Sequence, residues 1–210
     1  MVSMTTTTSP SGAPFIVGLG GSLGPSSTSL AALRHVLAKA EAAGARTRLL
    51  DVRTLDLPPF DPSLKEAPPA ARDLADAMHA ADAVVWSSPM YHGTVSGAFK
   101  NALDWLQLLA DRKPAYLTNK PVALIATAAG AQGLQAINTM EFVVRALRGW
   151  TLPFVVPIAK SYAAFGPDGA LVDETASKQL GLLAAEIVAA ARRFGTPSAA
   201  SLPLPLAVAQ

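Results

Sequence analysis

Apolar residues follow two alternating patterns between residues 15 and 194. Short continuous apolar runs, such as FIVGLG at 15–20, predict buried parallel strands. Longer segments with apolar residues three or four positions apart, such as Leu30, Leu33 and Leu37, predict helices with one buried face. The predicted strands are 15–20, 45–52, 83–88, 121–128 and 152–158, and the predicted helices are 27–43, 70–81, 95–109, 133–149 and 174–194.

This alternation of five strands with five helices predicts an α/β fold, a doubly wound parallel sheet with helices on both faces. The first strand–helix turn narrows the choice of sheet. Gly18 and Gly20 are followed by Leu23 where a dinucleotide-binding turn needs its third glycine, and no Gly-Lys-Ser/Thr of a P-loop follows. We therefore expect the strand order 2-1-3-4-5, in which the loops after strands one and three open at the same switch point.

Length and composition support one domain. The chain has 210 residues, of which 50% are hydrophobic and 15% charged, a balance that suits a well-buried core. Residues 1–14 are rich in Thr, Ser and Pro, and residues 196–210 in Ser, Pro and small residues. We expect a disordered N-terminal tail at 1–14, a domain at 15–195 and a loose C-terminal tail at 196–210.

The charged and metal-binding residues argue against several classes of function. A net charge of +2 without a dense basic cluster argues against nucleic-acid binding. The absence of cysteine excludes thiolate catalysis and Cys-ligated metals, and His35, His79 and His92 lack ligand spacing. No apolar run reaches the length of a bilayer span and the N-terminus does not resemble a secretory signal, so we expect a cytoplasmic protein without membrane contact.

Two loops carry the candidate chemistry. After the first strand, GGSLGPSSTSL (20–30) places glycines and a run of hydroxyls before a helix, where free amides and the helix dipole can bind a phosphate. The alternative is that Ser26 or Ser27 only caps the helix. After the third strand, SSPMYHG (87–93) contains the turn formers Pro89 and Gly93 and suits a flat ring lying along backbone amides.

These loops carry a resemblance to a known family. GSLGPSSTS (21–29) resembles the phosphate loop of the NAD(P)H-dependent FMN reductase family, although Gly24 stands where that loop has arginine. SPMYHGTVSGAFKNALDWL (88–106) is similar to the family's second motif, and ATAAGAQG (126–133) stands where the family has a flavin loop. The second motif is the specific one, because these residues hold their places: Tyr91, Gly93, Gly97, Lys100, Asn101, Asp104 and Trp105.

The resemblance implies a flavodoxin-like, FMN-binding enzyme. NADPH or NADH would reduce FMN, which would pass electrons to a small-molecule acceptor such as free flavin, a quinone, an azo compound or a metal oxyanion. Copies of the chain would form a homodimer or homotetramer through helix 96–109, to which apolar area would come from Trp105, Leu106, Leu108 and Leu109. The residues implied to bind the FMN phosphate are Ser22, Ser27, Thr28 and Ser29, and those along the ring and ribityl chain are Pro89, Met90, Tyr91, His92, Gly93, Ala129 and Gly130.

Alternatives remain for single residues and for the whole protein. Tyr91 either lies near the flavin or caps the sheet edge, and His92 either faces the flavin or is solvated. Arg46, Arg48 and Arg53 flank the second strand, as a solvated basic edge or as a site for the nicotinamide phosphate. The alternative functions are a flavodoxin-like electron carrier, against which the slightly basic charge argues, and a flavodoxin-fold protein without cofactor.

Overall fold

The structure, a computed structural model, describes residues 12–194. Residues 1–11 and 195–210 lie outside the described part, and with them nearly all of the two predicted tails. Residues 12–14 are described, and the carbonyl of Pro14 accepts a hydrogen bond of 2.9 Å from the amide of Arg46. Pro14 therefore already contacts the sheet, one residue before the first strand begins.

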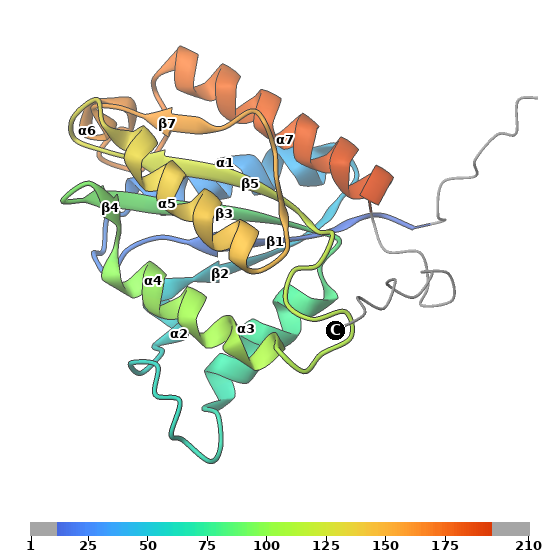
Figure 1. Cartoon of the computed structure of the whole chain (residues 1–210). Coiled ribbons are helices and arrows are strands. Elements are labelled where there is room, and N and C mark those ends of the chain that lie inside the picture. Colours follow the sequence, from blue (N-terminus) through green and yellow to red (C-terminus); the bar gives the residue numbers. More distant parts are fainter. Residues whose placement is uncertain (1–11, 195–210) are drawn as a thin grey trace, which may run out of the picture.

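A single sheet with helices on both faces forms the molecule (Figure 1). Its main order is β2-β1-β3-β5-β6, and the pairs along this path are parallel, which confirms the expected 2-1-3-4-5 arrangement. The strands are β1 (Phe15–Gly20), β2 (Arg46–Asp51), β3 (Ala83–Tyr91), β4 (Thr94–Val95), β5 (Pro121–Thr127), β6 (Trp150–Thr151) and β7 (Val156–Ile158).

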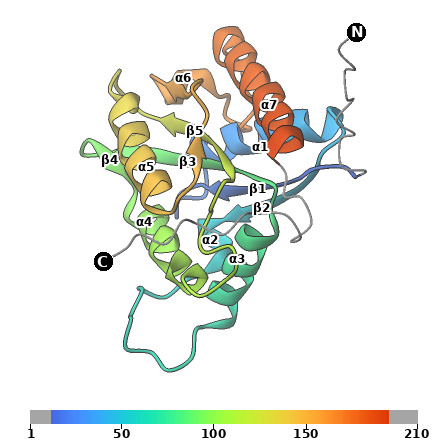
Figure 2. The ribbon, with the colours of Figure 1, turned by 45° about the vertical axis from the view of Figure 1, so that its right-hand side comes forward.

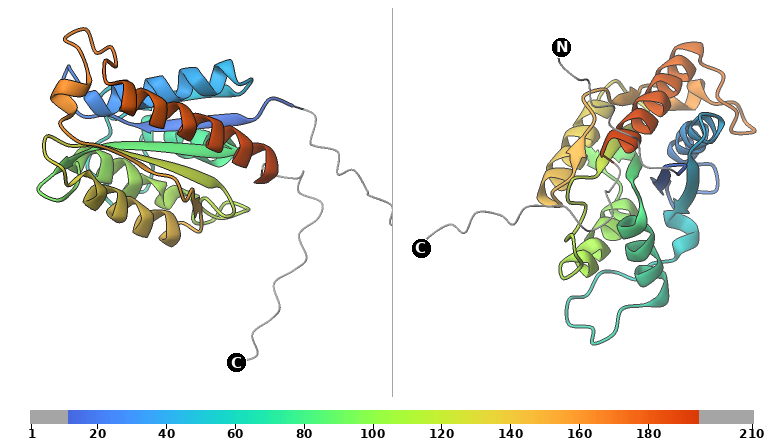
Figure 3. Two further views of the ribbon diagram at one scale, coloured as in Figure 1. Left: turned by 90° about the horizontal axis from the view of Figure 1, so that it is seen from above. Right: turned by 90° about the vertical axis from the view of Figure 1, so that its right-hand side faces the viewer.

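The helices occupy two layers, as the views in Figures 2 and 3 show. Helices α1 and α7 lie together on one face, and α3, α4 and α5 cover the other. The predicted helices are all present, with shifts of a few residues at their ends and two short additions, α2 and α6. The helices are α1 (Thr28–Ala42), α2 (Val52–Leu55), α3 (Pro69–Ala80), α4 (Gly97–Asp104), the 3-10 helix η1 (Trp105–Leu109), α5 (Gly133–Ala146), α6 (Ser161–Ala164) and α7 (Glu174–Phe194).

Alternating side chains of the central strands supply the two halves of the core. Ile16 and Val85 pack toward α1 and α7, whereas Val17, Val84 and Trp86 pack toward the other helix layer. Successive strand residues point to opposite faces, so a strand buried on both sides must be apolar at every position. This is why the strands appear in the sequence as continuous apolar runs.

The predicted fifth strand, 152–158, is wrong in its continuity. Only residues 156–158 of it form a strand, β7, and a second short strand, β6, precedes it at 150–151; β6 and β7 both pair with β5, one at each end. Pro153 lies in the break between them. A proline has no amide to donate and a fixed φ, so it interrupts a ladder, while Pro157 is tolerated in β7 because that strand lies at the sheet edge.

The predicted third strand, 83–88, is too short. β3 continues to Tyr91 and then reverses into β4 as an antiparallel hairpin, with Met90 opposite Val95. Pro89 fits inside this strand because β1 has already ended at Gly20, opposite Ser87. On that side of β3, the missing amide of Pro89 therefore leaves no ladder bond unmade.

No helix among residues 12–194 is long and apolar enough to cross a membrane.

Lys120 is buried at the amino-terminal edge of β5, with 6% of its surface exposed. Its Nζ donates to the carbonyls of His79, at 2.8 Å, and Ala81, which lie at the carboxyl end of α3. Burial lowers the pKa of Lys120, and the nearby Asp82 carboxylate opposes that shift in part. The amine therefore joins α3 to β5 at the cost of burying a charge.

We expect the free energy of unfolding of the wild type to rise, relative to that of Lys120→Met, as the pH increases toward 10.5. The pKa of Lys120 is lower in the folded chain than in the unfolded chain. Between these two pKa values the unfolded chain binds more protons, so the free energy of unfolding rises with pH; above the unfolded value neither state holds the proton and the rise ends. Urea unfolding at several alkaline pH values measures the difference. Lys65→Met, at an exposed lysine, is the control, and parallel pH profiles for the two variants would contradict the prediction.

Candidate functional site at the carboxyl edge of the sheet

The loop after β1 leaves the sheet in close contact with β3. A Cβ atom on Gly20 would lie 2.3 Å from the carbonyl oxygen of Ser87, a distance that no side chain permits. The amide of Gly21, at a φ of 100°, donates to the same carbonyl at 3.2 Å. Glycine is required at this pass, and loop 21–27 consequently starts directly above the neighbouring strand.

The serine run at the start of α1 has a structural role and leaves donors for a ligand. The Ser27 hydroxyl caps α1 by accepting the amide of Leu30 at 3.2 Å, so the predicted cap is present at this residue. The amides of Thr28 and Ser29 belong to the first helical turn, where no intrahelical carbonyl can accept them. The cap and an anion site are therefore compatible at this helix end.

Two hydroxyl contacts hold the start of α1 against the sheet, and a third lies within the helix start itself. Thr28 Oγ1 donates to Thr127 Oγ1 at 3.2 Å, which joins the helix to the last residue of β5. Ser29 is buried; its hydroxyl lies 3.0 Å from that of Ser27, and its carbonyl accepts from Ser87 Oγ at 2.8 Å. Ser22 is half-buried in the loop above. The four predicted phosphate residues thus lie in one loop and the first turn that follows it.

The second predicted loop is a hairpin rather than an irregular loop. His92 and Gly93 form its turn with φ angles of 49° and 83°, the left-handed conformations that a two-residue turn of type I′ requires. At the base of the hairpin, Ser88 Oγ accepts the amide of Ser96 at 3.1 Å. This bond braces the β3–β4 hairpin against the start of α4.

The hairpin side chains divide between core and surface. Pro89 is buried and Met90 packs against the core, whereas Tyr91 is 53% exposed and His92 is exposed. At the tip, the side chain of Gln135 on α5 lies so close to Gly93 that an added Cβ would come within 2.9 Å of its Oε1. The tip of the hairpin therefore exposes the side chains of Tyr91 and His92 and the backbone beside them.

A third loop follows β5 and completes the edge. The amide of Ala128 donates to Ile158 at 2.9 Å, and the carbonyl of Ala128 accepts from Ser161 at 3.0 Å. Beyond this anchor, Ala129 and Gly130 are exposed, and a Cβ on Gly130 would meet nothing within 4 Å. Residues 129 and 130 thus form an exposed segment of backbone, the ledge, that follows a fixed anchor at Ala128.

The structure brings all the predicted site residues to the carboxyl edge of the sheet, on the left in Figure 1, where the β3–β4 hairpin and α6 are labelled. Sequence reasoning missed Thr127 and Gln135, which contact Thr28 and Gly93 across the fold. A hydroxyl closing the apolar run 121–126 was the available signal for Thr127. Gln135 gave none, because its neighbour is 42 positions away in the chain.

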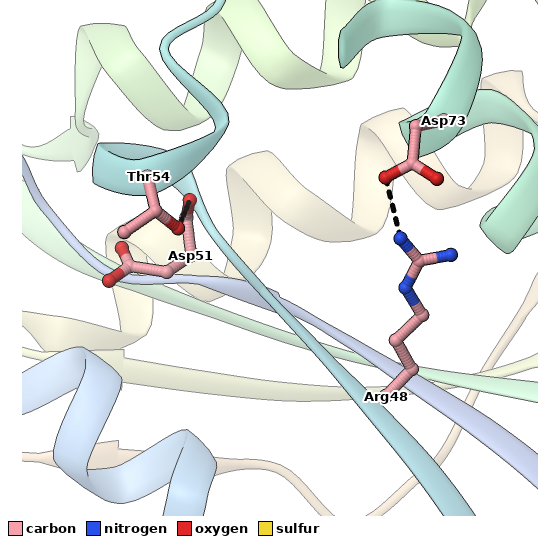
Figure 4. A network of polar contacts seen from close by, with 4 residues as sticks. All are labelled: Arg48, Asp51, Thr54 and Asp73. Carbon is pink, nitrogen blue, oxygen red and sulfur yellow. Dashed lines mark hydrogen bonds and ion pairs between the residues drawn. The ribbon is translucent and has the colours of Figure 1, made fainter.

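The basic residues of β2 lie apart from this edge or are already paired. Arg46 stacks its guanidinium 5.0 Å from the ring centre of Phe15, at the opposite end of β1. Arg48 forms an exposed 2.5 Å ion pair with Asp73 on α3, as Figure 4 shows. Asp51 caps α2 by accepting the amide of Arg53 at 3.0 Å. These contacts favour the solvated basic edge over a phosphate-binding role for Arg46 and Arg48.

Two side chains, one from α4 and one from η1, hold a loop in place. Asn101 accepts the amide of Phe60 at 2.8 Å and donates to the carbonyl of Pro58 at 2.9 Å. Trp105 donates its Nε1 hydrogen to the same carbonyl, also at 2.9 Å, and meets the ring of Phe60 edge to face. These two side chains thus clamp the proline-rich loop 57–60 to the helix.

The predicted role of the apolar side chains of helix 96–109 is wrong for most of them. Trp105, Leu106 and Leu109 are buried in the core of their own chain, with at most 1% of their surface exposed, and only Leu108 is partly exposed. They pack beneath the sheet, so they cannot supply apolar area to a second copy. On the outer side of the helix, Lys100 forms an exposed ion pair with Asp104, one turn further on, at 2.6 Å.

No group of three or more acidic or histidine side chains within residues 12–194 is arranged to hold a metal ion.

Comparisons with known proteins bear on this edge. The chain is 30% identical over 150 residues to the NADPH-dependent FMN reductase ArsH of Shigella flexneri, covering 71% of this chain and 57% of that protein. It is 33% identical over 115 residues to an FMN-dependent NADPH-azoreductase of Staphylococcus aureus, covering 55% and 58%. The matches thus span less than two thirds of these curated relatives.

Among solved structures, the fold is similar to that of a flavoenzyme NAD(P)H:(acceptor) oxidoreductase from Paracoccus denitrificans. The TM-score is 0.69 at 24% sequence identity, over 87% of this chain and 99% of that one. A profile of the family described as NADPH-dependent FMN reductase matches residues 14–163, which contain all three loops of the carboxyl edge. The chain therefore belongs to the NADPH-dependent FMN reductase family.

Proposed function

We propose that this protein is an FMN-dependent oxidoreductase that takes a hydride from NADPH or NADH and passes the electrons to a small acceptor. One observation carries the proposal: the capped start of α1, the exposed hairpin tip and the open ledge at Gly130 share one edge of the sheet. In α/β sheets of this kind, ligands bind at the carboxyl edge near the switch point.

The chemistry of the donor set suits the FMN phosphate. Ser22, Ser27 and Thr28 offer partly exposed hydroxyls, and the first turn of α1 offers amides and the positive end of its dipole. The hydroxyl of Ser29 is buried against Ser27, so we propose that Ser29 contributes through its backbone amide. The close pass at Gly20 keeps the loop low over β3, so a bound phosphate would lie beside the strand ends. Residues 15–33 contain no lysine or arginine, and neutral donors therefore hold the charge in this proposal.

The hairpin and the ledge suit the flavin ring. Residues 89–93 would lie along the ring and ribityl chain, and Ala129 and Gly130 would close the far side. Because no side chain occupies the space at Gly130, a flat ring can approach the backbone there. The exposure of Tyr91 favours contact with the ring over a cap on the sheet edge, whereas the exposure of His92 agrees both with contact to the ring and with solvation.

When bound, FMN supplies the redox chemistry by accepting the hydride at N5. The protein's contribution is position and dipoles. The backbone amides around His92 and Gly93 are held by the left-handed turn and can stabilise negative charge on the ring edge. No general acid or base is needed, which agrees with the lack of a catalytic side-chain cluster in the sequence.

The acceptor follows from access to the ring. An exposed ring edge admits small flat or anionic acceptors in turn, so we propose a free flavin, a quinone, an azo compound or a metal oxyanion. The azo class is supported by the name of the S. aureus relative. We also propose that copies of the chain associate along the outer side of helix 96–109, where Lys100 and Gln107 are exposed beside Leu108.

Purified protein mixed with one equivalent of FMN should show bound-flavin absorption bands that bleach on anaerobic addition of NADPH or NADH. Bleaching requires a flavin held where a nicotinamide can reach it. A bound flavin that stays yellow with both nicotinamides would instead indicate an electron carrier. Absence of flavin binding would leave the serine run with its capping role alone.

Ser27→Asp separates the helix cap from the phosphate site. Aspartate caps helices as well as serine does and favours the helix dipole, so the melting temperature should stay close to that of the wild type. Its negative charge should weaken FMN binding by about tenfold or more through repulsion of the phosphate. Titrations with FMN and with riboflavin measure this; equal losses for both ligands would place the phosphate elsewhere.

Gly93→Val should weaken FMN binding because it forces a branched side chain into the hairpin tip, against Gln135. Gly44→Val is the matched control: its φ of 88° is close to the 83° of Gly93, but it lies after α1 at the far edge of the sheet. Each variant should lose about 1–2 kcal/mol of stability through strain. Unchanged FMN affinity in Gly93→Val, or equal loss in both variants, would count against the ring position.

A further inference from the structure

A groove lies beside the phosphate loop, on the side of α1 that faces α6. Its volume is about 560 Å³. One wall is formed by residues 25–28 and by the next turns of α1, up to Arg34. The other wall is formed by Tyr162 and by the segment 165–169. The groove therefore shares Ser27 and Thr28 with the proposed FMN phosphate site and extends away from it.

The chain's own hydrogen bonds shape the second wall. Phe165 pairs with Leu171 across a small hairpin, and the amide of Gly166 donates to the carbonyl of Ala170 at 2.8 Å. Asp168 is engaged in this turn, where its Oδ1 accepts the amide of Ala170 at 3.0 Å. The wall is a closed turn with its own internal bonds, and its one acidic side chain lies opposite α1.

An aromatic ring stands in the groove without a protein neighbour that covers it. Tyr162 is 70% exposed although it lines the groove. Its backbone is fixed, because the preceding residue, Ser161, donates its amide to the carbonyl of Ala128. A ring held in this way offers a face on which a planar base can stack.

Arg34 supplies the positive charge of the groove. It is the first cationic residue after β1 begins, it is exposed, and it forms no ion pair within the described part of the chain. Lys160 and Arg53 lie at the same edge of the sheet but do not line the groove. A guanidinium binds phosphate oxygens with two parallel donors, which makes Arg34 a suitable partner for a phosphate monoester.

We propose that this groove binds the adenosine 2′-phosphate end of NADPH, with Arg34 on the 2′-phosphate and Tyr162 against the adenine. The inference rests on the proposed function, since it names the part of the chain that selects the nicotinamide. NADPH and NADH differ only in this phosphate, so selection needs a cation within reach of it. The acidic Asp168 on the opposite wall orients the phosphate toward α1, and the shared Ser27 places the groove next to the flavin site.

Binding of adenosine 2′,5′-bisphosphate to the FMN-loaded protein, measured by calorimetry, tests the groove without turnover. Arg34→Gln should weaken this binding by about tenfold to a hundredfold, the usual value of charge-assisted hydrogen bonds. The KM for NADPH should rise by a similar factor, while the KM for NADH and the affinity for FMN stay unchanged. Arg193→Gln, at an exposed arginine near the far end of α7, removes the same charge and should change neither.

Tyr162 provides a second, independent variant. Tyr162→Ala should weaken binding of the bisphosphate, and Tyr162→Phe should retain it, because stacking needs the ring and not the hydroxyl. Both substitutions are at an exposed position, so the fold should tolerate them.

Two results would overturn the proposal. One is unchanged bisphosphate binding and an unchanged ratio of the NADPH and NADH KM values in Arg34→Gln. The other is a loss of FMN affinity in Arg34→Gln, which would make the groove part of the flavin phosphate site. Failure of the proposed reductase function is a separate observation, because it is read from bound flavin that neither nicotinamide bleaches, whereas the groove is read from bisphosphate binding.

Discussion

The close pass of β1 against β3 at Gly20 is the contact on which the carboxyl edge depends. The residue next to the sheet must lack a side chain, because the Ser87 carbonyl occupies the place of its Cβ. The loop that follows is thereby held low, and α1 begins where Thr28 can reach Thr127 at the end of β5. Hydroxyls from α1 and β5 thereby meet beside the free amides of the first helical turn.

The second determinant is the extension of β3 beyond its neighbour β1. Because β1 ends opposite Ser87, the last residues of β3 are free to pair with β4 and to form a hairpin that rises above the edge. His92 and Gly93 form the left-handed turn at its tip, and the bond that Ser88 Oγ accepts from the amide of Ser96 braces its base against the start of α4. The family's second motif thus has two parts, a hairpin at the carboxyl edge and a helical segment whose Asn101 and Trp105 clamp a distant loop.

Much of the fold could be predicted because local pattern and global fold agree. Continuous apolar runs identify the buried strands, and helix periodicity identifies the helices, with α7 predicted at its observed bounds. Prediction failed where neighbours decide the outcome. Pro153 splits the last strand, Pro89 remains inside β3 because the adjacent strand has ended, and Trp105 turns inward because Pro58 and Phe60 lie there to meet it.

The sequence by itself determined the strand order, the family and the two loops that carry the candidate chemistry, because these were recognised from residue types at short spacing. Only the tertiary structure decided how the loops meet. It placed Gln135 against Gly93, joined Thr28 to Thr127, paired Arg48 with Asp73, and set Arg34 across a groove from Tyr162. These partners are separated by between 25 and 128 positions in the chain. Local propensity carries no information about such contacts, since they arise only when the sheet and its two helix layers pack.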